Sequence, residues 1–353
     1  MKNFPTRIIA WQRSHGRHTL PWQATHDPYR IWLSEIMLQQ TQVATVIPYF
    51  LRFVERFPDM QALASAHEDE VLALWSGLGY YSRARNLHVA ARRIVHEYAG
   101  GFPDTLEAIA SLPGIGRSTA AAIMALAFGQ RHAILDGNVK RVLARHGKID
   151  GWPGEKTVEN RLWKLAEALL PEPGVSRTDI EAYTQGMMDL GASLCTRIRP
   201  ACNACPVSAD CMAFNQGSIT ELPTPRPRKI LPEKCVQMLL LMDRGEILLE
   251  KRPPRGIWGG LWSLPEIPPE ADATAHCHER LGLAVSETIL LPGLRHNFTH
   301  FRLHIHPAVM HIAPRPLKVE TPECLWLSRQ DALGAALPAP VRWLLSQPAT
   351  LRQ

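Results

Sequence analysis

No stretch of the 353-residue sequence is apolar over the ~18 residues that a membrane-spanning helix needs, and residues 1–21 lack the apolar block of a secretory signal peptide. Neither sign of charge dominates, since 39 lysines and arginines stand against 33 aspartates and glutamates. The net charge of +6 permits a polyanionic partner without requiring one. We therefore expect a cytoplasmic protein without a membrane partner, and nucleic-acid binding must be argued from local sites.

Alternation of apolar and polar residues, which marks a half-buried strand, is missing before residue 230. Helical spacing takes its place. We expect helices over residues 3–18, 28–42, 43–56, 68–76, 82–98, 105–111, 118–128, 139–146, 157–170 and 179–190.

The pattern changes after residues 222–232, which hold four prolines in eleven positions and predict a stiff linker. Strand-like runs follow at 236–242, 247–251, 304–311 and 324–327, with helices near 271–281 and 338–346. The sequence thus predicts an all-α domain over residues 1–221, a proline-rich linker over 222–234 and an α+β domain over 235–353.

A glycine-rich turn, Leu112-Pro-Gly-Ile-Gly116, precedes a helix of small residues. Gly114 and Gly116 allow a tight turn that points backbone N–H groups at an anion such as phosphate. A generic helix–helix hairpin is the alternative reading. Asp136 follows an apolar run and precedes a basic helix that contains Lys140, so it is either an N-cap or a carboxylate beside the phosphate site.

Glu35 lies in a helical stretch that is apolar on most faces. It either pairs with an arginine or a backbone N–H at the helix edge, or it is a half-buried acid with a raised pKa, which can donate a proton near neutral pH. The uncharged polar run that follows, including Gln39 and Gln40, suits contact with base edges and also suits an ordinary exposed helix end.

Residues 77–86 place two tyrosines and two arginines in a glycine-hinged loop. Aromatic rings such as Tyr80 can stack on or wedge between bases, and arginines such as Arg83 can hold phosphate. The alternative is a tyrosine pair that closes a helix end.

Matched pairs of CxxC motifs, usual in zinc ribbons, are also missing. Four cysteines instead follow the last helix with spacings of six, two and five residues: Cys195, Cys202, Cys205 and Cys211. Four thiolates so close indicate a metal site, and they suit either a [4Fe-4S] cluster or zinc.

Residues 1–220 resemble the helix-hairpin-helix DNA glycosylases through the LPGIG turn, an aspartate twenty residues beyond Gly116, and the cysteine loop over 195–211. The stretches at 32–43, 77–88, 112–120 and 135–142 are most similar to the adenine-specific branch, whose C-terminal domain is Nudix-like. The resemblance implies a base excision repair hydrolase with one [4Fe-4S] cluster. It would act as a monomer, associated with the nucleoid, on adenine paired with 8-oxoguanine or guanine in double-stranded DNA.

The resemblance also implies roles for individual residues. Glu35 would protonate the N7 atom of adenine, Asp136 would stay ionised beside the developing sugar cation, and Asn138 would orient the acid or the sugar. Phe298, Thr299 and His300 would recognise 8-oxoguanine. The expected DNA contacts are Gln39, Gln40, Tyr80, Arg83, Gly114, Gly116, Ser118, Lys140, Phe298, Thr299 and His300.

At two places the sequence differs from related enzymes, and each difference argues against one further activity. Bifunctional relatives carry a lysine nucleophile where this sequence has Ser118, so no efficient Schiff base is expected. Catalytic Nudix hydrolases carry a glutamate-rich metal helix, but residues 276–282 keep a single acid. The alternatives left are a bifunctional pyrimidine glycosylase with lyase activity, a Nudix pyrophosphohydrolase and a non-catalytic DNA-binding module.

Overall fold

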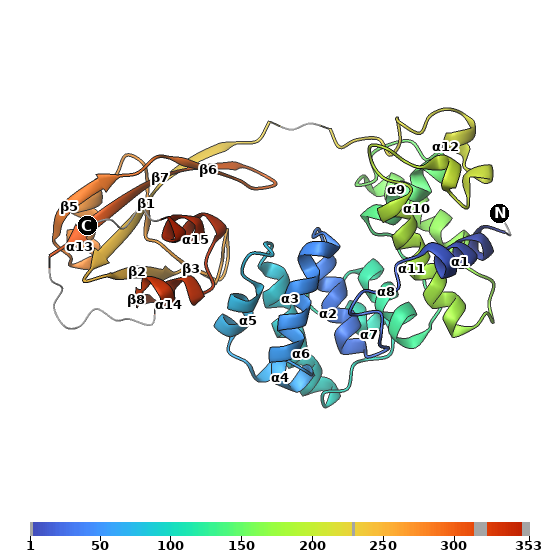
Figure 1. Ribbon diagram of the computed structural model, residues 1–353, viewed down its shortest axis with the longest axis horizontal. Coiled ribbons are helices and arrows are strands. Elements are labelled where there is room, and N and C mark those ends of the chain that lie inside the picture. The colour runs from blue at the N-terminus through green and yellow to red at the C-terminus, as the bar shows by residue number, and fades with distance from the viewer. Residues whose placement is uncertain (1–2, 228–229, 314–322, 348–353) are drawn as a thin grey trace. The chain divides into compact units, whose positions relative to one another are not determined.

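The computed structural model describes residues 3–227, 230–313 and 323–347, and the chain divides into two compact units (Figure 1). The first unit comprises Met1–Ser65 and Asn86–Arg228, and the second comprises Ala66–Arg85 and Lys229–Gln353. Residues 66–85 thus group with the C-terminal part of the chain. The domain boundaries predicted from the sequence remain a proposal.

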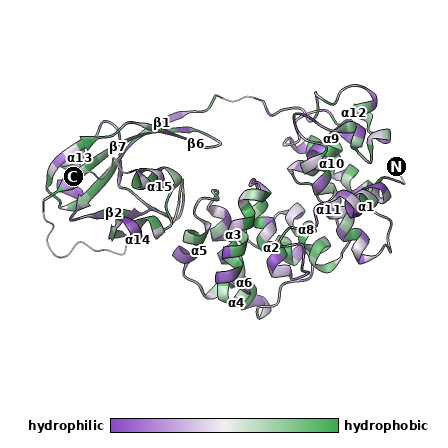
Figure 2. Cartoon of the chain, viewed as in Figure 1, coloured by the Kyte–Doolittle hydropathy of each residue, from purple (hydrophilic) through white to green (hydrophobic). Residues whose placement is uncertain are grey.

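The first unit is helical. Its elements are α1 (Phe4–His15), α2 (Pro28–Leu38), α3 (Val43–Arg56), α4 (Met60–Ser65), most of α6 (Ser82–Tyr98), α7 (Leu106–Ala110), α8 (Arg117–Phe128), α9 (Gly137–His146), α10 (Lys156–Ala168), α11 (Arg177–Ser193) and α12 (Met212–Asn215), with 3₁₀ turns at Cys202–Ala204 and Ser208–Asp210. Hydrophobic and hydrophilic residues are interspersed along these helices (Figure 2).

Local capping explains where these helices begin and end. Asp27 accepts a hydrogen bond from the Tyr29 N–H at 3.0 Å at the start of α2, where Pro28 suits the first helical position. Gly129, with φ of 67°, ends α8. The helix predicted over 28–42 is too long at its C-terminal end. In the structure, α2 ends at Leu38, and Gln40 adopts a φ of 58°, which a helix does not allow.

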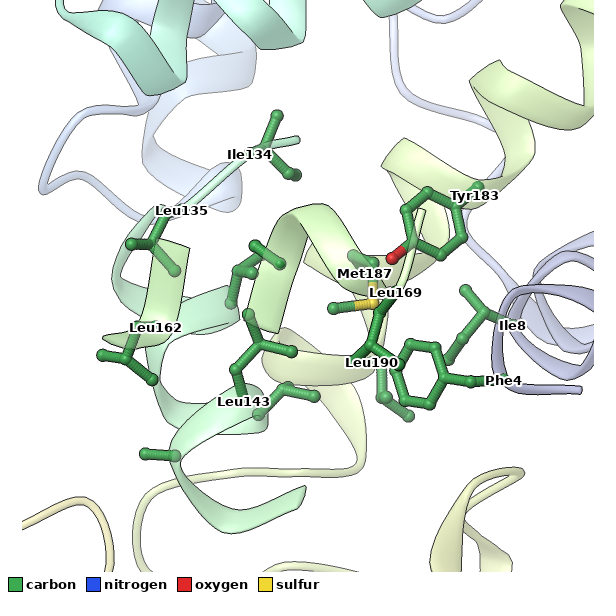
Figure 3. Close-up of a cluster of buried hydrophobic side chains, with 14 of the residues drawn as sticks. Phe4, Ile8, Ile134, Leu135, Leu143, Leu162, Leu169, Tyr183, Met187 and Leu190 are labelled. Atoms are coloured by element: carbon green, nitrogen blue, oxygen red, sulfur yellow. The ribbon is translucent and has the colours of Figure 1, made fainter. Parts of the chain in front are cut away.

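A buried cluster joins helices α1, α8, α9, α10 and α11 of the first unit, and Figure 3 shows part of it. Phe4 and Ile8 from α1 pack with residues of α9, α10 and α11, among them Leu143, Leu162, Tyr183, Met187 and Leu190. Ile134 and Leu135, just before α9, are buried in the same cluster. Their burial fixes the chain immediately before Asp136.

The second unit contains a mixed sheet, which confirms the α+β expectation. Its strands are β1 (Glu233–Asp243), β2 (Glu246–Lys251), β3 (Trp262–Ser263), β4 (Glu266–Ile267), β5 (Val285–Leu290), β6 (Leu294–Asn297), β7 (Arg302–Ile312) and β8 (Cys324–Ser328). Its helices are α5 (Glu68–Trp75), α13 (Ala273–Leu281), α14 (Arg329–Gly334) and α15 (Ala339–Ser346).

The long strands β1 and β7 run parallel and side by side, in the order β3-β2-β1-β7-β5, and β4, β6 and β8 pair off this path (Figure 1). The other pairings are antiparallel. One face of the sheet packs around Cys277 of α13. No helix within the described ranges is long and apolar enough to cross a membrane.

Candidate active site

A cleft of ≈ 850 Å³ in the first unit brings together residues that are far apart in the sequence. It lies between the C-terminal end of α2, the N-terminal turn of α8 and the start of α9. Of the predicted site residues, it is lined by Glu35, Gln39, Gln40, Ser118, Asp136 and Asn138. The packing of α2 on α8 and the buried segment before Asp136 account for this convergence.

Glu35 projects into this cleft from α2, whose neighbouring residues Trp32, Leu33, Ile36 and Met37 are all buried. Burial raises the pKa of the Glu35 carboxyl to about 7, and the charge of Asp136 adds to the rise. Desolvation disfavours the charged form, and a second carboxylate nearby disfavours it further. Glu35 is therefore able to hold a proton near neutral pH.

Asp136 begins α9 as its N-cap, and Oδ1 accepts a hydrogen bond from the Val139 N–H at 2.7 Å. Burial raises the pKa of this carboxyl, while the backbone N–H groups of Val139 and Asn138 and the charges of Arg141 and Lys140 lower it. The N-cap interpretation is thus confirmed. It does not conflict with a role in the cleft, because the same donors that cap the helix favour the charged carboxylate.

The glycine-rich turn has the conformation that its sequence predicts. Gly114 adopts φ of 79°, and a Cβ atom there would lie 2.9 Å from Cβ of Asn86. Gly116 is the N-cap of α8. The first N–H groups of this helix follow an exposed turn, the usual setting for an anion at a helix N-terminus.

Ser118 does more than begin a helix. Its Oγ accepts a hydrogen bond from the Leu135 N–H at 2.8 Å. This bond ties the first turn of α8 to the segment that carries Asp136. Nothing in the sequence pattern indicates the bond, because its two ends are 17 residues apart in a hairpin.

Asn138 is held by Arg141, one turn further along α9. Arg141 donates to Oδ1 of Asn138 at 2.8 Å, to the Gly191 carbonyl at 2.6 Å and to the Cys195 carbonyl at 2.7 Å. Lys140, predicted to contact DNA, forms an ion pair with Glu159 at 2.8 Å.

All seven cysteines are free of disulfides. Among the residues that the structure describes, no three His, Cys, Asp or Glu side chains stand at metal-binding distance. The thiols of 195–211 nevertheless interact: burial raises the pKa of Cys205 to about 11, and the charges of Cys195, Cys211 and Cys202 contribute.

The donors around these thiols fit a bound metal group. Backbone N–H groups of Phe214 and Ala213 point at Cys211, and the guanidinium of Arg145 lies 3.4 Å from Sγ of Cys195. Such donors stabilise thiolates, the form in which cysteine binds metal.

A second cavity, of ≈ 540 Å³, lies within the second unit. It is lined by Tyr80, Phe298, Thr299 and His300, the predicted residues of this part of the chain, together with Trp258. The rings of Trp258 and Phe298 lie 5.3 Å apart. Trp258 is buried and has φ of 55°, which its sequence context does not reveal.

The two tyrosines of the loop over residues 77–86 differ in their exposure to solvent. Tyr81 is buried and accounts for the predicted packing role, while the Tyr80 side chain is 44% exposed. Arg83 is buried, and its guanidinium donates to the carbonyls of Leu78 and Gly79 at 3.3 and 3.2 Å. Arg83 therefore supports the loop from within, and in this conformation it does not present its charge to a phosphate.

Arg17 also lines the cleft and was not among the predicted residues. Its Nη2 pairs with Oδ1 of Asp189 at 2.6 Å, and Asp189 is buried. No motif indicates Arg17, since it lies in the connection after α1, and only the fold brings it to Asp189.

Comparison with known proteins identifies the family. Residues 33–168 match the model for the HhH-GPD superfamily of base excision DNA repair proteins, and residues 236–347 match the model for the NUDIX domain. The adenine DNA glycosylase of Buchnera aphidicola (strain APS) is 36% identical over 344 residues, 97% of this chain and 96% of that protein. The chain belongs to the adenine DNA glycosylase family.

The human adenine DNA glycosylase is 33% identical, over 95% of this chain and 72% of its own length. Among solved structures, a thermostable thymine-DNA glycosylase aligns with a TM-score of 0.52 and 30% identity, over 61% of this chain and 96% of that one. An endonuclease III–DNA complex aligns with a TM-score of 0.50 at 19% identity, over 60% of this chain and 94% of that one, and supports the fold alone. The predicted family and fold class are confirmed.

Proposed function

We propose that this adenine DNA glycosylase hydrolyses the N-glycosidic bond of adenine paired with 8-oxoguanine or guanine in double-stranded DNA, leaving an abasic site. The observation that carries the proposal is the pairing, in one cleft, of Glu35, whose pKa is about 7, with the N-capping carboxylate Asp136. We further propose that it acts as a monomer, in the cytoplasm and on the nucleoid.

Cleavage of the N-glycosidic bond leaves negative charge on adenine and positive charge on the sugar. Each of the two acids would stabilise one of these charges. Protonated Glu35 would donate its proton to N7 of the extruded adenine, which makes the base a better leaving group, and would then help to activate water. Ionised Asp136 would stabilise the positive charge on the sugar. At ~4 Å and an effective dielectric near 20, that attraction is worth roughly 4 kcal/mol, about three decades of rate.

Neighbouring groups would orient these two acids. Asn138, held by Arg141, would position the acid or the sugar, and Ser118 would keep the segment before Asp136 in place. Gly114 and Gly116 would present backbone N–H groups to a DNA phosphate, and Lys140 would add positive charge. Gln39 and Gln40 would contact base edges next to the cleft.

The partner base would be read in the second unit. Phe298 and Tyr80 offer aromatic faces, and Thr299 and His300 offer hydrogen-bonding groups, around a cavity large enough for a purine. Because 8-oxoguanine differs from guanine at C8 and N7, a few hydrogen bonds must carry the distinction.

We propose that base removal proceeds without a strong lyase step, since Ser118 supplies no amine. Ser118→Lys should give a borohydride-trappable DNA adduct well above background. Ser118→Ala is the matched control, because it loses the bond from the Leu135 N–H without adding an amine. Equal trapping by the two variants would refute the assignment.

We propose that Cys195, Cys202, Cys205 and Cys211 hold one [4Fe-4S] cluster. Such a cluster cross-links four thiolates and anchors the loop between α11 and α12. Purified protein should be brown and contain iron and sulfide. Stoichiometric zinc without a visible absorption band would contradict this proposal.

The substrate proposal is tested by base release from duplexes with A:8-oxoguanine, A:G and A:C pairs, with and without alkali. Adenine release with strand scission only after alkali is the expected result. Release of a damaged pyrimidine with spontaneous scission would favour the bifunctional alternative, and DNA binding without release would favour a binding module. Turnover of nucleotides with magnesium would favour a Nudix hydrolase, although α13 offers only Glu279.

A further inference from the structure

Residues 76–81 form hydrogen bonds with the C-terminal part of the second unit. Oγ of Ser76 donates to the Leu337 carbonyl at 3.2 Å, and the hydroxyl of Tyr81 donates to the same carbonyl at 3.2 Å. Arg342 of α15 donates to Oγ of Ser76 at 3.0 Å. These bonds hold the two ends of residues 76–81, which we call the Tyr80 loop.

Arg342 is the centre of this attachment. Its Nη1 donates to the Leu333 carbonyl at 2.6 Å, and its Nη2 donates to the Ala335 carbonyl at 3.0 Å as well as to Ser76. One guanidinium therefore joins the connection between α14 and α15 to the Tyr80 loop. The side chain is partly buried, and neither Arg342 nor Ser76 lines the ≈ 540 Å³ cavity.

The Tyr80 loop depends on such anchors because its own backbone is permissive. Gly77 and Gly79 have φ of 104° and 72°, and Tyr80 itself has φ of 48°, a conformation that residues other than glycine seldom adopt. Arg83 braces the middle of the loop through two carbonyls. The first residue of the loop, Ser76, is held through its hydroxyl, which accepts a hydrogen bond from Arg342 and donates one to the Leu337 carbonyl.

We propose that Arg342, acting through Ser76, is a positioning residue that sets the preference for 8-oxoguanine over guanine opposite adenine. The inference rests on the proposed function. Tyr80 lines the same cavity as Phe298, Thr299 and His300. Without the Ser76 anchor, the glycines let Tyr80 sample more conformations, and a cavity that is not preorganised distinguishes two similar purines poorly.

Two variants and their combination test this inference in the full-length protein. Ser76→Ala removes the hydroxyl but leaves the bonds from Arg342 to Leu333 and Ala335. Arg342→Gln removes the guanidinium. Arg329→Gln is the matched control, because Nε of Arg329 donates to the Leu345 carbonyl at 2.7 Å and so joins α14 to α15 without contacting the Tyr80 loop.

The measurement is single-turnover adenine release from A:8-oxoguanine and A:G duplexes, with enzyme in excess of DNA at subsaturating and at saturating concentrations. We expect Ser76→Ala and Arg342→Gln each to lower the preference for A:8-oxoguanine at subsaturating enzyme about fivefold, the usual effect of losing one hydrogen bond. The double variant should lose no more than the stronger single variant, because both remove the same link. Release from A:G at saturating enzyme should stay within about twofold of wild type.

An unchanged preference in both single variants would overturn the inference, and so would an equal loss in Arg329→Gln. Additive losses in the double variant would also overturn it. If wild-type enzyme releases no adenine from any duplex, the proposed function itself fails. If wild type prefers A:8-oxoguanine and the variants keep that preference, only the role of Arg342 fails.

Discussion

Glu35 and Asp136 are two carboxyl groups that the protein treats differently. Glu35 comes from a helix surrounded by apolar side chains, so burial dominates its pKa. Asp136 is also buried, but its carboxylate accepts a hydrogen bond from the Val139 N–H and lies near the charge of Arg141. These unlike surroundings suit the two carboxyls to the acid and counter-charge roles that we propose for them.

Replacing Glu35 should make the fold more stable at alkaline pH. Between pH 4.5 and about 7, folded wild type holds a proton that the unfolded chain has released, so its free energy of unfolding falls as pH rises through this window. Glu35→Gln cannot ionise, and we expect it to be more stable than wild type by roughly 1–3 kcal/mol at pH 8.5, with a smaller difference at pH 4.5.

Urea unfolding at the two pH values measures this difference. Glu55→Gln, on the exposed side of α3, controls for the loss of a carboxylate. A gain in stability for Glu35→Gln that is equal at both pH values, or is absent, would show that Glu35 is not buried in the folded protein.

At the scale of elements, α9 links the cleft to the cysteine loop. Asp136 caps its start, and Asn138 follows in its first turn. Arg141 joins Asn138 to the carbonyls of Gly191 and Cys195. One turn later, Arg145 donates to the Thr196 carbonyl at 2.7 Å and to the Leu222 carbonyl at 2.7 Å.

Cutting this connection should slow base release more than it weakens DNA binding. Arg141→Gln frees the amide of Asn138 and removes a positive charge that favours ionised Asp136. We expect the single-turnover rate at saturating enzyme to fall about tenfold. Lys156→Gln, which removes an exposed partner of Glu159 on α10, should leave the rate near wild type. A fall in affinity alone would contradict this assignment.

The hairpin before α8 offers a matched pair of glycines. Gly114→Ala must place a side chain at φ of 79°, 2.9 Å from Cβ of Asn86, and should destabilise the protein by about 1–3 kcal/mol. A Cβ at Gly116 meets nothing within 4 Å, so Gly116→Ala should cost only about 0.5–1 kcal/mol, the difference between glycine and alanine at an N-cap. Thermal unfolding of both variants compares them, and equal melting temperatures would contradict the turn geometry.

Element boundaries were predictable where periodicity was strong. The helices expected over 43–56 and 82–98 have those bounds as α3 and α6, because their apolar residues recur at helical spacing. The short helix α4 and the strands β5 and β6 were missed. Nearly every residue of β5 is exposed, so its sequence shows no alternation that burial would impose.

At the scale of the whole molecule, the sequence indicated residues that line the cleft, but not the contacts that hold them there. Glu35, Asp136 and the cysteines stand in motifs, and the family resemblance named their neighbours. The grouping of residues 66–85 with the C-terminal part could not be predicted, since it depends on contacts such as Ser76 with Leu337, 261 positions apart. The sequence predicted that Arg83 holds a phosphate. That prediction missed the burial of its side chain, which only the fold reveals.

We propose above all that Glu35 is the acid that releases adenine. Its most direct test is single-turnover release of adenine from an A:8-oxoguanine duplex by wild type and by Glu35→Gln, with binding of each protein to the same duplex measured in parallel. We predict a rate about a thousandfold lower for Glu35→Gln with DNA affinity retained. Release at near wild-type rate by Glu35→Gln would contradict the account.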